Sequence, residues 1–372
     1  MFNVQKILDD RLYQLFTKEE KYIVDSVIAA AEKTEKRCTS SDLYNIVNEL
    51  NRTLNVHLFR LKNANHIVSL SCKACIYMLI RLAYKTIDLS ALYMLHYQCS
   101  ERLNRHSTTS ELREVIHNVI NNHGIMASAW SNERSGGACI VTDKINGLYL
   151  NGKKYISTGA KNSQYIHILV DDPDYNGTSF ICIKNNSFDK DIVFERLELN
   201  SFQMAGNYSI YLNQYTVNNG LFLGVRGRGE QLKMESHESG FNPGLLALGQ
   251  LCYLLQYLVN SMPYIANSEE YHLVELKTTN LVDEFSRSLE DGSYFSLKKT
   301  TSFKVASTSL FRDAVIMFLP LFGPSSLVAH GDLYKLINNS IFLQNMGPAN
   351  YQVLNDAPLS SYTASRIVAN YC

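Results

Sequence analysis

The sequence predicts an α+β protein with three parts in chain order: a helical N-terminal domain, a middle β-barrel or sandwich, and a C-terminal four-helix bundle. From the start to about residue 124, and again after residue 226, apolar residues recur at the three- and four-residue spacing of helices. Between these parts the period falls to two, with turn residues separating short runs rich in Ile, Val, Tyr and Phe. We therefore expect domains at 1–124, 125–225 and 226–372.

The composition is that of a globular protein with balanced charge. The 372 residues include 35 Lys and Arg against 35 Asp and Glu, so the formal net charge is zero. Such a balance provides no field that attracts nucleic acid or anionic lipid. The first ten residues contain no apolar signal core, and the longest apolar runs, 245–259 and 314–323, are shorter than the roughly 20 residues that cross a bilayer. We expect a cytoplasmic protein with no membrane or nucleic-acid partner.

The eight cysteines do not form a pattern typical of a disulfide scaffold. Cys72 and Cys75 have the spacing of a redox or metal pair, but they lie in a helix-like apolar run with no second pair or histidine cluster beside them. We expect a structural role for both and no metal site.

The N-terminal part is predicted to contain four or five helices. Thr17 and Glu20 have capping-box spacing, and the apolar residues that follow them keep the helical period. Further helical segments are expected at 79–95 and 110–120, and C-terminal helices at 245–259, 273–289, 302–321 and 333–343.

The middle part is predicted to be an antiparallel sandwich or barrel, because its strands are short and regularly spaced. Asn151-Gly152 is expected to form a type I′ hairpin turn. The expected strands are 148–155, 166–170, 179–183, 192–197 and 208–215.

Two motifs in the middle part identify a family resemblance. The first is the run from Ala129 to Ala138, AWSNERSGGA, and the second is the run from Gly147 to Ala160, GLYLNGKKYISTGA. Together they resemble the acyl-CoA dehydrogenase family of flavoproteins, in which a Thr-Glu-Pro-x-x-Gly-Ser-Asp run precedes a Leu-Asn-Gly-x-Lys-x-(Trp/Tyr)-Ile-Thr-Asn-Gly hairpin. The second motif matches at Asn151, Gly152, Lys154, Ile156 and Gly159, with one residue fewer than the family after Lys154. In the first motif, Asn132, Arg134 and Ala138 replace the usual Thr, Pro and Ser. Weaker similarities extend in order over nearly the whole chain.

The resemblance implies a bound FAD whose isoalloxazine ring lies against the β domain. At the matching positions, Ser131 and Asn132 would meet one edge of the ring, Tyr155 would stack near it, and Ser157 would donate a hydrogen bond to it. Glycines in the first motif would let backbone N–H groups approach phosphate or substrate. The expected cofactor-binding residues are Ala129, Ser131, Asn132, Gly137, Ala138, Tyr155 and Ser157.

The sequence departs from the family at the catalytic base, a glutamate that removes the α-proton of the acyl thioester. One family position falls on 358–361, which has no acid, and the other falls on Asn242-Pro243. Glu238, one turn away, is the candidate base; its alternative role is a helix-start or solvated acid. The Arg-x-x-Phe-Gly motif that binds the FAD pyrophosphate across subunits is also absent, so we expect a homodimer in place of the family's usual tetramer.

Three functions remain open. The first is an FAD-dependent dehydrogenase for an acyl thioester on coenzyme A or an acyl carrier protein. Its reaction would oxidise a carrier-bound hydroxyl or aldehyde hydrate toward a malonyl-type extender such as aminomalonyl in secondary metabolism. That reaction needs no α-proton abstraction, so loss of the glutamate is tolerable. The second is a flavin monooxygenase, with His237 or His330 near the flavin. The third is a non-catalytic member. The electron acceptor is not indicated.

Overall fold

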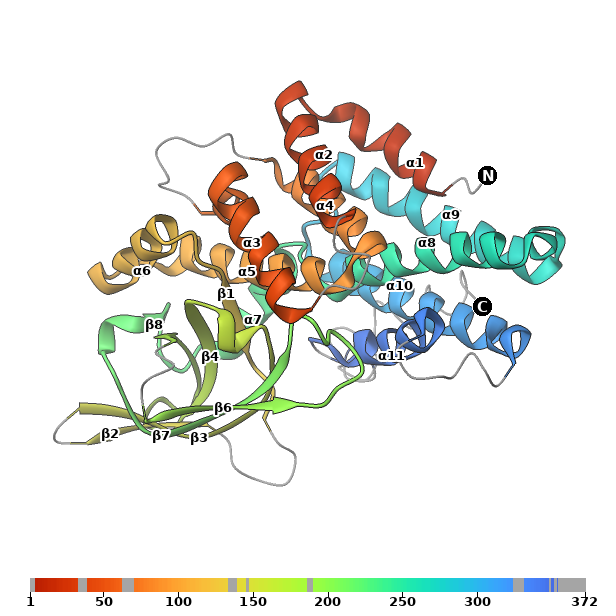
Figure 1. Ribbon diagram of the computed structural model, residues 1–372. Coiled ribbons are helices and arrows are strands. Elements are labelled where there is room, and N and C mark those ends of the chain that lie inside the picture. Colours follow the sequence, from red (N-terminus) through yellow and green to blue (C-terminus); the bar gives the residue numbers. More distant parts are fainter. Residues whose placement is uncertain are drawn as a thin grey trace. The chain divides into compact units, whose positions relative to one another are not determined.

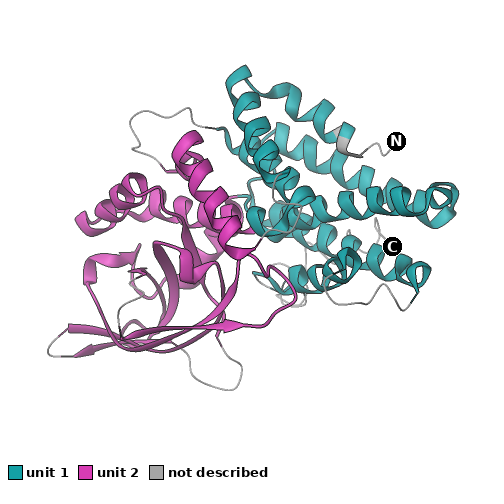
Figure 2. Ribbon diagram, in the orientation of Figure 1, with its two compact units in different colours: residues 1–35, 70–90, 240–372 teal, residues 36–69, 91–239 magenta. Residues whose placement is uncertain are grey.

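The computed structural model describes residues 4–32, 39–61, 70–132, 139–144, 147–185, 190–323, 331–347, 349–350 and 353. Helices open and close the chain and strands lie between them (Figure 1). The chain forms two compact units. Unit 1 comprises residues 1–35, 70–90 and 240–372, and unit 2 comprises 36–69 and 91–239 (Figure 2). The N-terminal helices are thus divided between the units, and the three-domain division stays a prediction.

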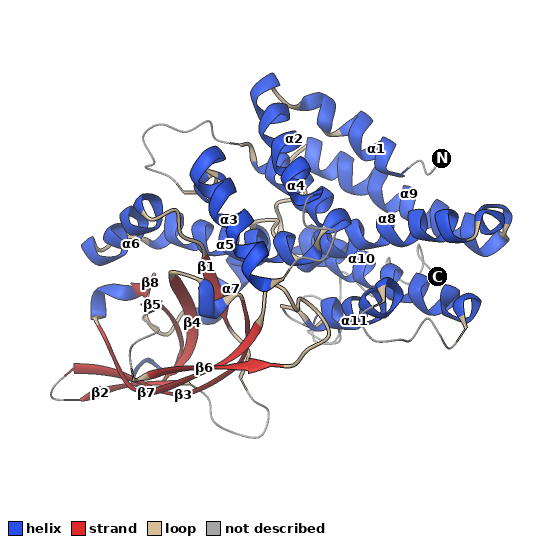
Figure 3. Cartoon of the chain, viewed as in Figure 1, coloured by secondary structure: helices blue, strands red, loops and turns tan. Residues whose placement is uncertain are grey.

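Unit 1 is built from long helices, coloured blue in Figure 3. Its core helix α8 packs against α4, α10 and α11. At Gly249 in α8, an added Cβ would lie 2.4 Å from the carbonyl oxygen of Ile80 in α4, so glycine allows these two helices to approach closely. The helices are α1 (Val4–Arg11), α2 (Lys18–Glu32), α4 (Cys72–Lys85), α8 (Pro243–Ser261), α9 (Glu269–Glu290), α10 (Leu297–Phe318) and α11 (Asp332–Asn345), and α5 (Ile87–His106) starts in this unit.

The predicted capping box is confirmed at the start of α2. The Glu20 carboxylate accepts from the Thr17 N–H at 2.9 Å, and the Thr17 hydroxyl accepts from the Glu20 N–H at 3.2 Å. The other oxygen of Glu20 accepts from the Ser71 N–H at 2.9 Å, at the N-terminus of α4. One carboxylate therefore stabilises the starts of two helices.

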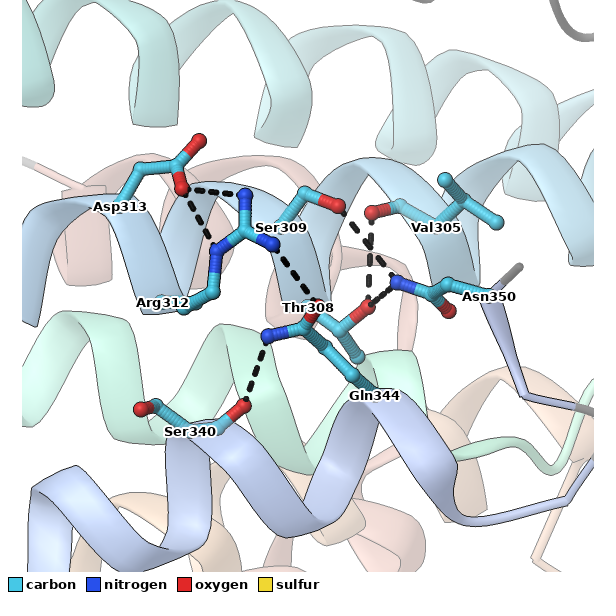
Figure 4. A network of polar contacts seen from close by, with 8 residues as sticks. All are labelled: Val305, Thr308, Ser309, Arg312, Asp313, Ser340, Gln344 and Asn350. Carbon is cyan, nitrogen blue, oxygen red and sulfur yellow. Dashed lines mark hydrogen bonds and ion pairs between the residues drawn. The ribbon is translucent and has the colours of Figure 1, made fainter. Parts of the chain in front are cut away.

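Polar side chains join α10 to α11 (Figure 4). Arg312 donates to the Gln344 side chain at 3.1 Å, and the Gln344 amide donates to the Ser340 carbonyl at 3.2 Å. Beyond the end of α11, the Asn350 amide donates to the Thr308 hydroxyl at 2.9 Å.

Among the described residues, one segment, Leu297–Phe322, is apolar and long enough to cross a membrane. Half of its most apolar window is buried, and a buried core helix has the same length and composition.

Unit 2 combines helices with an eight-stranded sheet whose strand order is β6-β7-β3-β2-β4-β5-β8, with β1 paired to β4. The pairs β1–β4 and β2–β4 are parallel, so the sheet is mixed and the expectation of an antiparallel sheet is wrong at these two pairs. The strands are β1 (Met126–Ala129), β2 (Ile140–Lys144), β3 (Gly147–Thr158), β4 (Tyr165–Asp172), β5 (Gly177–Lys184), β6 (Ile192–Leu197), β7 (Asn207–Val217) and β8 (Phe222–Leu223). The helices are most of α5 together with α3 (Ser40–Leu54), α6 (Ser110–Asn121) and α7 (Gly229–Glu238).

The predicted hairpin turn at Asn151-Gly152 is wrong. Both residues lie inside β3, and the pairing of β3 with β7 shifts register between Leu150 and Gly152. Gly152 has a φ of 122°, a backbone conformation that glycine adopts without strain. The Asn151 side chain accepts from the Gln214 N–H at 2.8 Å. The Asn-Gly pair therefore forms a β-bulge, which bends the strand without reversing it.

Both faces of the central strands are buried. On β4, Ile166, Ile168 and Val170 belong to one apolar cluster, whereas Tyr165 and Leu169 belong to another that contains residues of α5, α6 and α7. This alternation follows from the period of two along a strand. The residue between Tyr165 and Leu169 on the helix-covered face is His167, and it is paired with Ser128 of β1.

Candidate functional site

The segment that leaves β1 lies against β3 and brings together residues of both motifs. The Tyr155 N–H donates to the Ser131 carbonyl at 3.0 Å, and Ser131 forms an antiparallel bridge with Ile156. The Ser157 hydroxyl donates to the Ser128 carbonyl at 2.9 Å. Residues of the two motifs, which are separate in the sequence, are therefore neighbours in unit 2.

The exposure of these residues alternates sharply. Tyr155 is 45% exposed, whereas Lys154 is 1% and Ser157 is 2% exposed. Ser131 and Asn132 are also exposed. An aromatic ring that faces outward beside polar groups and the edge of a strand provides a flat surface on which a planar ligand can stack.

The other three predicted cofactor-binding residues are either buried among apolar side chains or outside the described part of the chain. Ala129 is fully buried, and its side chain belongs to the apolar cluster on the face of the sheet opposite to α5. Gly137 and Ala138 lie outside the described residues. The structure therefore brings Ser131, Asn132, Tyr155 and Ser157 together, and the assignment of all seven residues to cofactor binding stays a prediction.

A buried arginine that bonds to β1 was not among the residues predicted from the sequence. Arg102 of α5 is 2% exposed. It donates to the Ser236 hydroxyl at 2.8 Å, to His167 Nδ1 at 2.9 Å and to the Ser128 hydroxyl at 3.1 Å. Burial lowers its pKa below the usual value, and burial together with the charge of Arg102 holds the pKa of His167 well below its ordinary range.

Aromatic rings enclose the same guanidinium. Arg102 lies over the ring of Phe180 at 4.6 Å and over the ring of Trp130 at 5.2 Å. Trp130 also contacts the ring of His237 edge-to-face at 5.6 Å, and its indole N–H donates to the Ser128 hydroxyl. In α5, Arg102 follows Cys99 by three residues and directly precedes Leu103, and all three side chains are buried. This spacing on one helix is the sequence signal that could have located Arg102.

Lys154 is a second buried cation at the same segment. Its ammonium donates to the Trp130 carbonyl at 3.4 Å and to the Asn132 side-chain oxygen. Burial lowers its pKa to about 8. The lysine therefore holds the backbone at Trp130 and orients the amide of Asn132.

The two positions considered for a catalytic base differ in environment. Glu238 is the last residue of α7 and is partly exposed. It lies at a helix C-terminus, where the dipole disfavours a carboxylate, so the helix-start alternative is wrong; its catalytic role stays a prediction. Asn242 caps the N-terminus of α8: its oxygen accepts from the Gly244 N–H at 2.8 Å, and its amide donates to the Tyr294 hydroxyl at 2.9 Å. A neutral amide with both ends bonded cannot act as a general base.

The second family position for the base, at 358–361, and the nearby Asp356 lie outside the described residues, as does His330. Among the residues that the structure describes, no group of three or more His, Cys, Asp or Glu side chains could hold a metal ion. Cys72 and Cys75 both lie in α4 as reduced thiols.

Comparison with solved structures decides the fold. No protein-family model and no curated protein matches the sequence. Butyryl-CoA dehydrogenase from Megasphaera elsdenii superposes with a TM-score of 0.77 at 12% identity, over 95% of this chain and 99% of that chain. The chain has the acyl-CoA dehydrogenase fold. This confirms the predicted α+β fold and, at the level of the fold, the predicted family resemblance.

Two further structures with the acyl-CoA dehydrogenase fold carry more specific names. The prolyl acyl carrier protein oxidase AnaB matches with a TM-score of 0.73 at 14% identity, over 91% of this chain and 97% of that chain. An FAD complex of PigA matches with a TM-score of 0.72 at 17% identity, over 91% of this chain and 96% of that chain.

Proposed function

We propose that this chain is an FAD-dependent oxidoreductase that acts on an acyl thioester held by a carrier protein in a biosynthetic pathway. The observation that carries the proposal is the shared fold over nine-tenths of the chain with an oxidase named for an acyl carrier protein and with a structure named as an FAD complex. The clustering of Ser131, Asn132, Tyr155 and Ser157 supports the flavin part of the proposal.

These residues have the chemistry that a flavin ring requires. Ser157 donates its proton to the Ser128 carbonyl, so its oxygen retains lone pairs that can accept a hydrogen bond from a ligand N–H. The oxygen of Asn132 accepts from Lys154, which leaves the amide nitrogen as a donor. The ring of Tyr155 is 45% exposed, and the Lys153 ammonium lies over one of its faces, 5.6 Å from the centroid. The other face can stack on a planar ligand. FAD, when bound, supplies the two-electron oxidation.

The buried amide of Asn242, at a position where the family can carry its base, favours oxidation at a carbon that bears oxygen. Conversion of a carrier-bound hydroxyl to a carbonyl removes a hydride from carbon and a proton from oxygen, and no α-proton is abstracted. A neutral Asn242 is compatible with this chemistry, whereas α,β-dehydrogenation would need a carboxylate. Formation of a malonyl-type extender such as aminomalonyl is one reaction of this class.

The proposal is tested with the full chain purified in the presence of FAD. Acyl-CoA and acyl-carrier thioesters are screened by mass spectrometry with and without oxygen. We expect an oxidised-flavin absorbance spectrum and a product two hydrogens lighter from a carrier-bound hydroxyacyl group. Formation of an α,β-unsaturated product from a simple acyl-CoA at a normal rate would refute oxidation at the oxygen-bearing carbon. A colourless protein that binds no FAD would favour the non-catalytic alternative.

A flavin monooxygenase is the second candidate. His237 supports it, because this residue is 5% exposed and its ring contacts Trp130, one residue before Ser131. A polar group beside the flavin is what oxygen activation would need. Turnover without oxygen, with an artificial electron acceptor, would contradict this candidate.

A further inference from the structure

Two buried cations bond to the segment 128–132 from different elements. Arg102 of α5 bonds the Ser128 hydroxyl, and Lys154 of β3 bonds the Trp130 carbonyl and the Asn132 side chain. Their exposed fractions are 2% and 1%. Within the described parts of the chain, neither cation takes part in an ion pair with a carboxylate. Among the described residues, no carboxylate is therefore bonded to either of the two positive charges beside this short stretch of backbone.

A third largely buried cation of unit 2, Arg226, is bonded in a different way. Arg226 also has a largely buried guanidinium, and it binds both oxygens of Asp172, at 2.8 and 2.9 Å. A buried charge without such a partner is costly, because neutral hydrogen-bond partners replace its lost hydration only in part. Unit 2 neutralises Arg226 but leaves Arg102 and Lys154 bonded to hydroxyls, carbonyls, an imidazole and an amide.

Among the described residues, the other ionisable groups near these cations offset their charges only in part. The thiols of Cys99 and Cys182 lie near Arg102, but burial raises the pKa of both, so they stay uncharged near neutral pH. Cys139, Asp171, Glu230 and Lys233 act on Lys154, but each has a smaller effect on its pKa than burial does. Within the part of the chain that the structure describes, the charges of Arg102 and Lys154 are therefore offset only in part, which favours a positive potential at the segment that carries Ser131 and Asn132.

We propose that Arg102 and Lys154 make this segment a site for negative charge, and that FAD bound there is stabilised in its anionic reduced state. This inference rests on the proposed function. Addition of two electrons and one proton to the isoalloxazine ring leaves one negative charge on it, whereas the oxidised ring is neutral. A fixed positive charge therefore binds the reduced form more tightly than the oxidised form and raises the reduction potential. Arg102 would act on FAD through Ser128, and Lys154 would act on it through Asn132. Both are therefore positioning residues.

The test measures the midpoint potential of bound FAD against reference dyes in the full chain. Arg102→Met and Lys154→Met remove one charge each, and Arg102→Lys and Lys154→Arg retain it. At an effective dielectric constant of about 20, a unit charge within about 10 Å changes such an equilibrium on the order of tenfold. A tenfold loss of preference for reduced FAD corresponds to a fall of about 30 mV for a two-electron couple. We expect this fall in each methionine variant and a potential near wild type in the charge-retaining variants. Lys144→Met, which removes an exposed lysine of β2, is the matched control and should leave the potential unchanged.

Failure of the inference is distinguishable from failure of the proposed function. If wild-type protein binds no FAD, the proposed function falls and the inference falls with it. If FAD binds and both methionine variants keep the wild-type potential, only the charge argument is refuted. If Arg102→Met does not fold, the comparison of Lys154→Met with Lys154→Arg decides the question. An equal fall in potential in all four substitutions would show a structural effect and would also overturn the proposal.

Discussion

Buried histidines in unit 2 should make the protein sensitive to acid. His57 and His96 are both 0% exposed, and their rings lie in the same region as His123. Burial, with a smaller contribution from neighbouring histidines, lowers the pKa of His57 to about 3, and burial lowers that of His96 to about 4. Because both values lie below the unfolded value of about 6.5, the unfolded chain binds more protons, and stability falls as the pH drops below about 6.5.

The size of this effect follows from linkage. Between pH 7 and pH 5 each of these two histidines should reduce the free energy of unfolding by about 2 kcal/mol. The buried His167, whose pKa is also held well below its ordinary range, adds a similar amount, so the total is about 6 kcal/mol. Urea unfolding, followed by circular dichroism at pH 7, 6 and 5, measures this change in the free energy of unfolding. His57→Leu should remove about a third of the pH dependence, whereas His117→Gln, at an exposed helix position, should leave it unchanged. An unfolding free energy that is equal at pH 7 and pH 5 would refute the argument that these histidines are buried in their neutral form.

Three further substitutions test other parts of the structure. Gly249→Ala should destabilise unit 1 by about 1–3 kcal/mol in thermal unfolding, because its Cβ would lie 2.4 Å from the Ile80 carbonyl; unchanged stability would contradict the close approach of α4 and α8. Asn242→Ala should cost about 1–2 kcal/mol by loss of the cap of α8, whereas Asn242→Ser, which keeps an N-cap oxygen without burying a charge, should cost less; equal losses would argue against capping. Ser157→Ala should weaken FAD binding about tenfold in equilibrium dialysis, as expected for one lost hydrogen bond of about 1.4 kcal/mol; unchanged affinity would remove Ser157 from the site.

The sequence predicted the order of the elements well because hydrophobic periodicity is a local signal. The expected helix at 245–259 is observed as Pro243–Ser261, and the expected strand at 192–197 is observed with the same bounds. Asn151-Gly152 misled the prediction because the same pair that favours a hairpin turn also tolerates the positive φ of a β-bulge. Pairing with β7 decides between the two outcomes, and that is a contact between distant segments.

The candidate site was predicted in part. The motifs located Ser131, Asn132, Tyr155 and Ser157, which do lie together in unit 2. Arg102 was missed because a single arginine in an amphipathic helix is usually solvated, and its burial depends on Ser128, His167 and Ser236 from three other elements. Such a contact set is a property of the tertiary structure that spacing along one helix cannot reveal.

FAD binding by wild-type protein and by Tyr155→Ala, followed by absorbance after equilibrium dialysis, tests the central claim most directly. We predict about one FAD per chain for wild type and a clear loss of affinity for Tyr155→Ala, with Tyr175→Ala, at another exposed tyrosine of unit 2, as the matched control. Absence of FAD from the wild-type protein, or equal affinity in wild type and Tyr155→Ala, would contradict a flavin site at this strand.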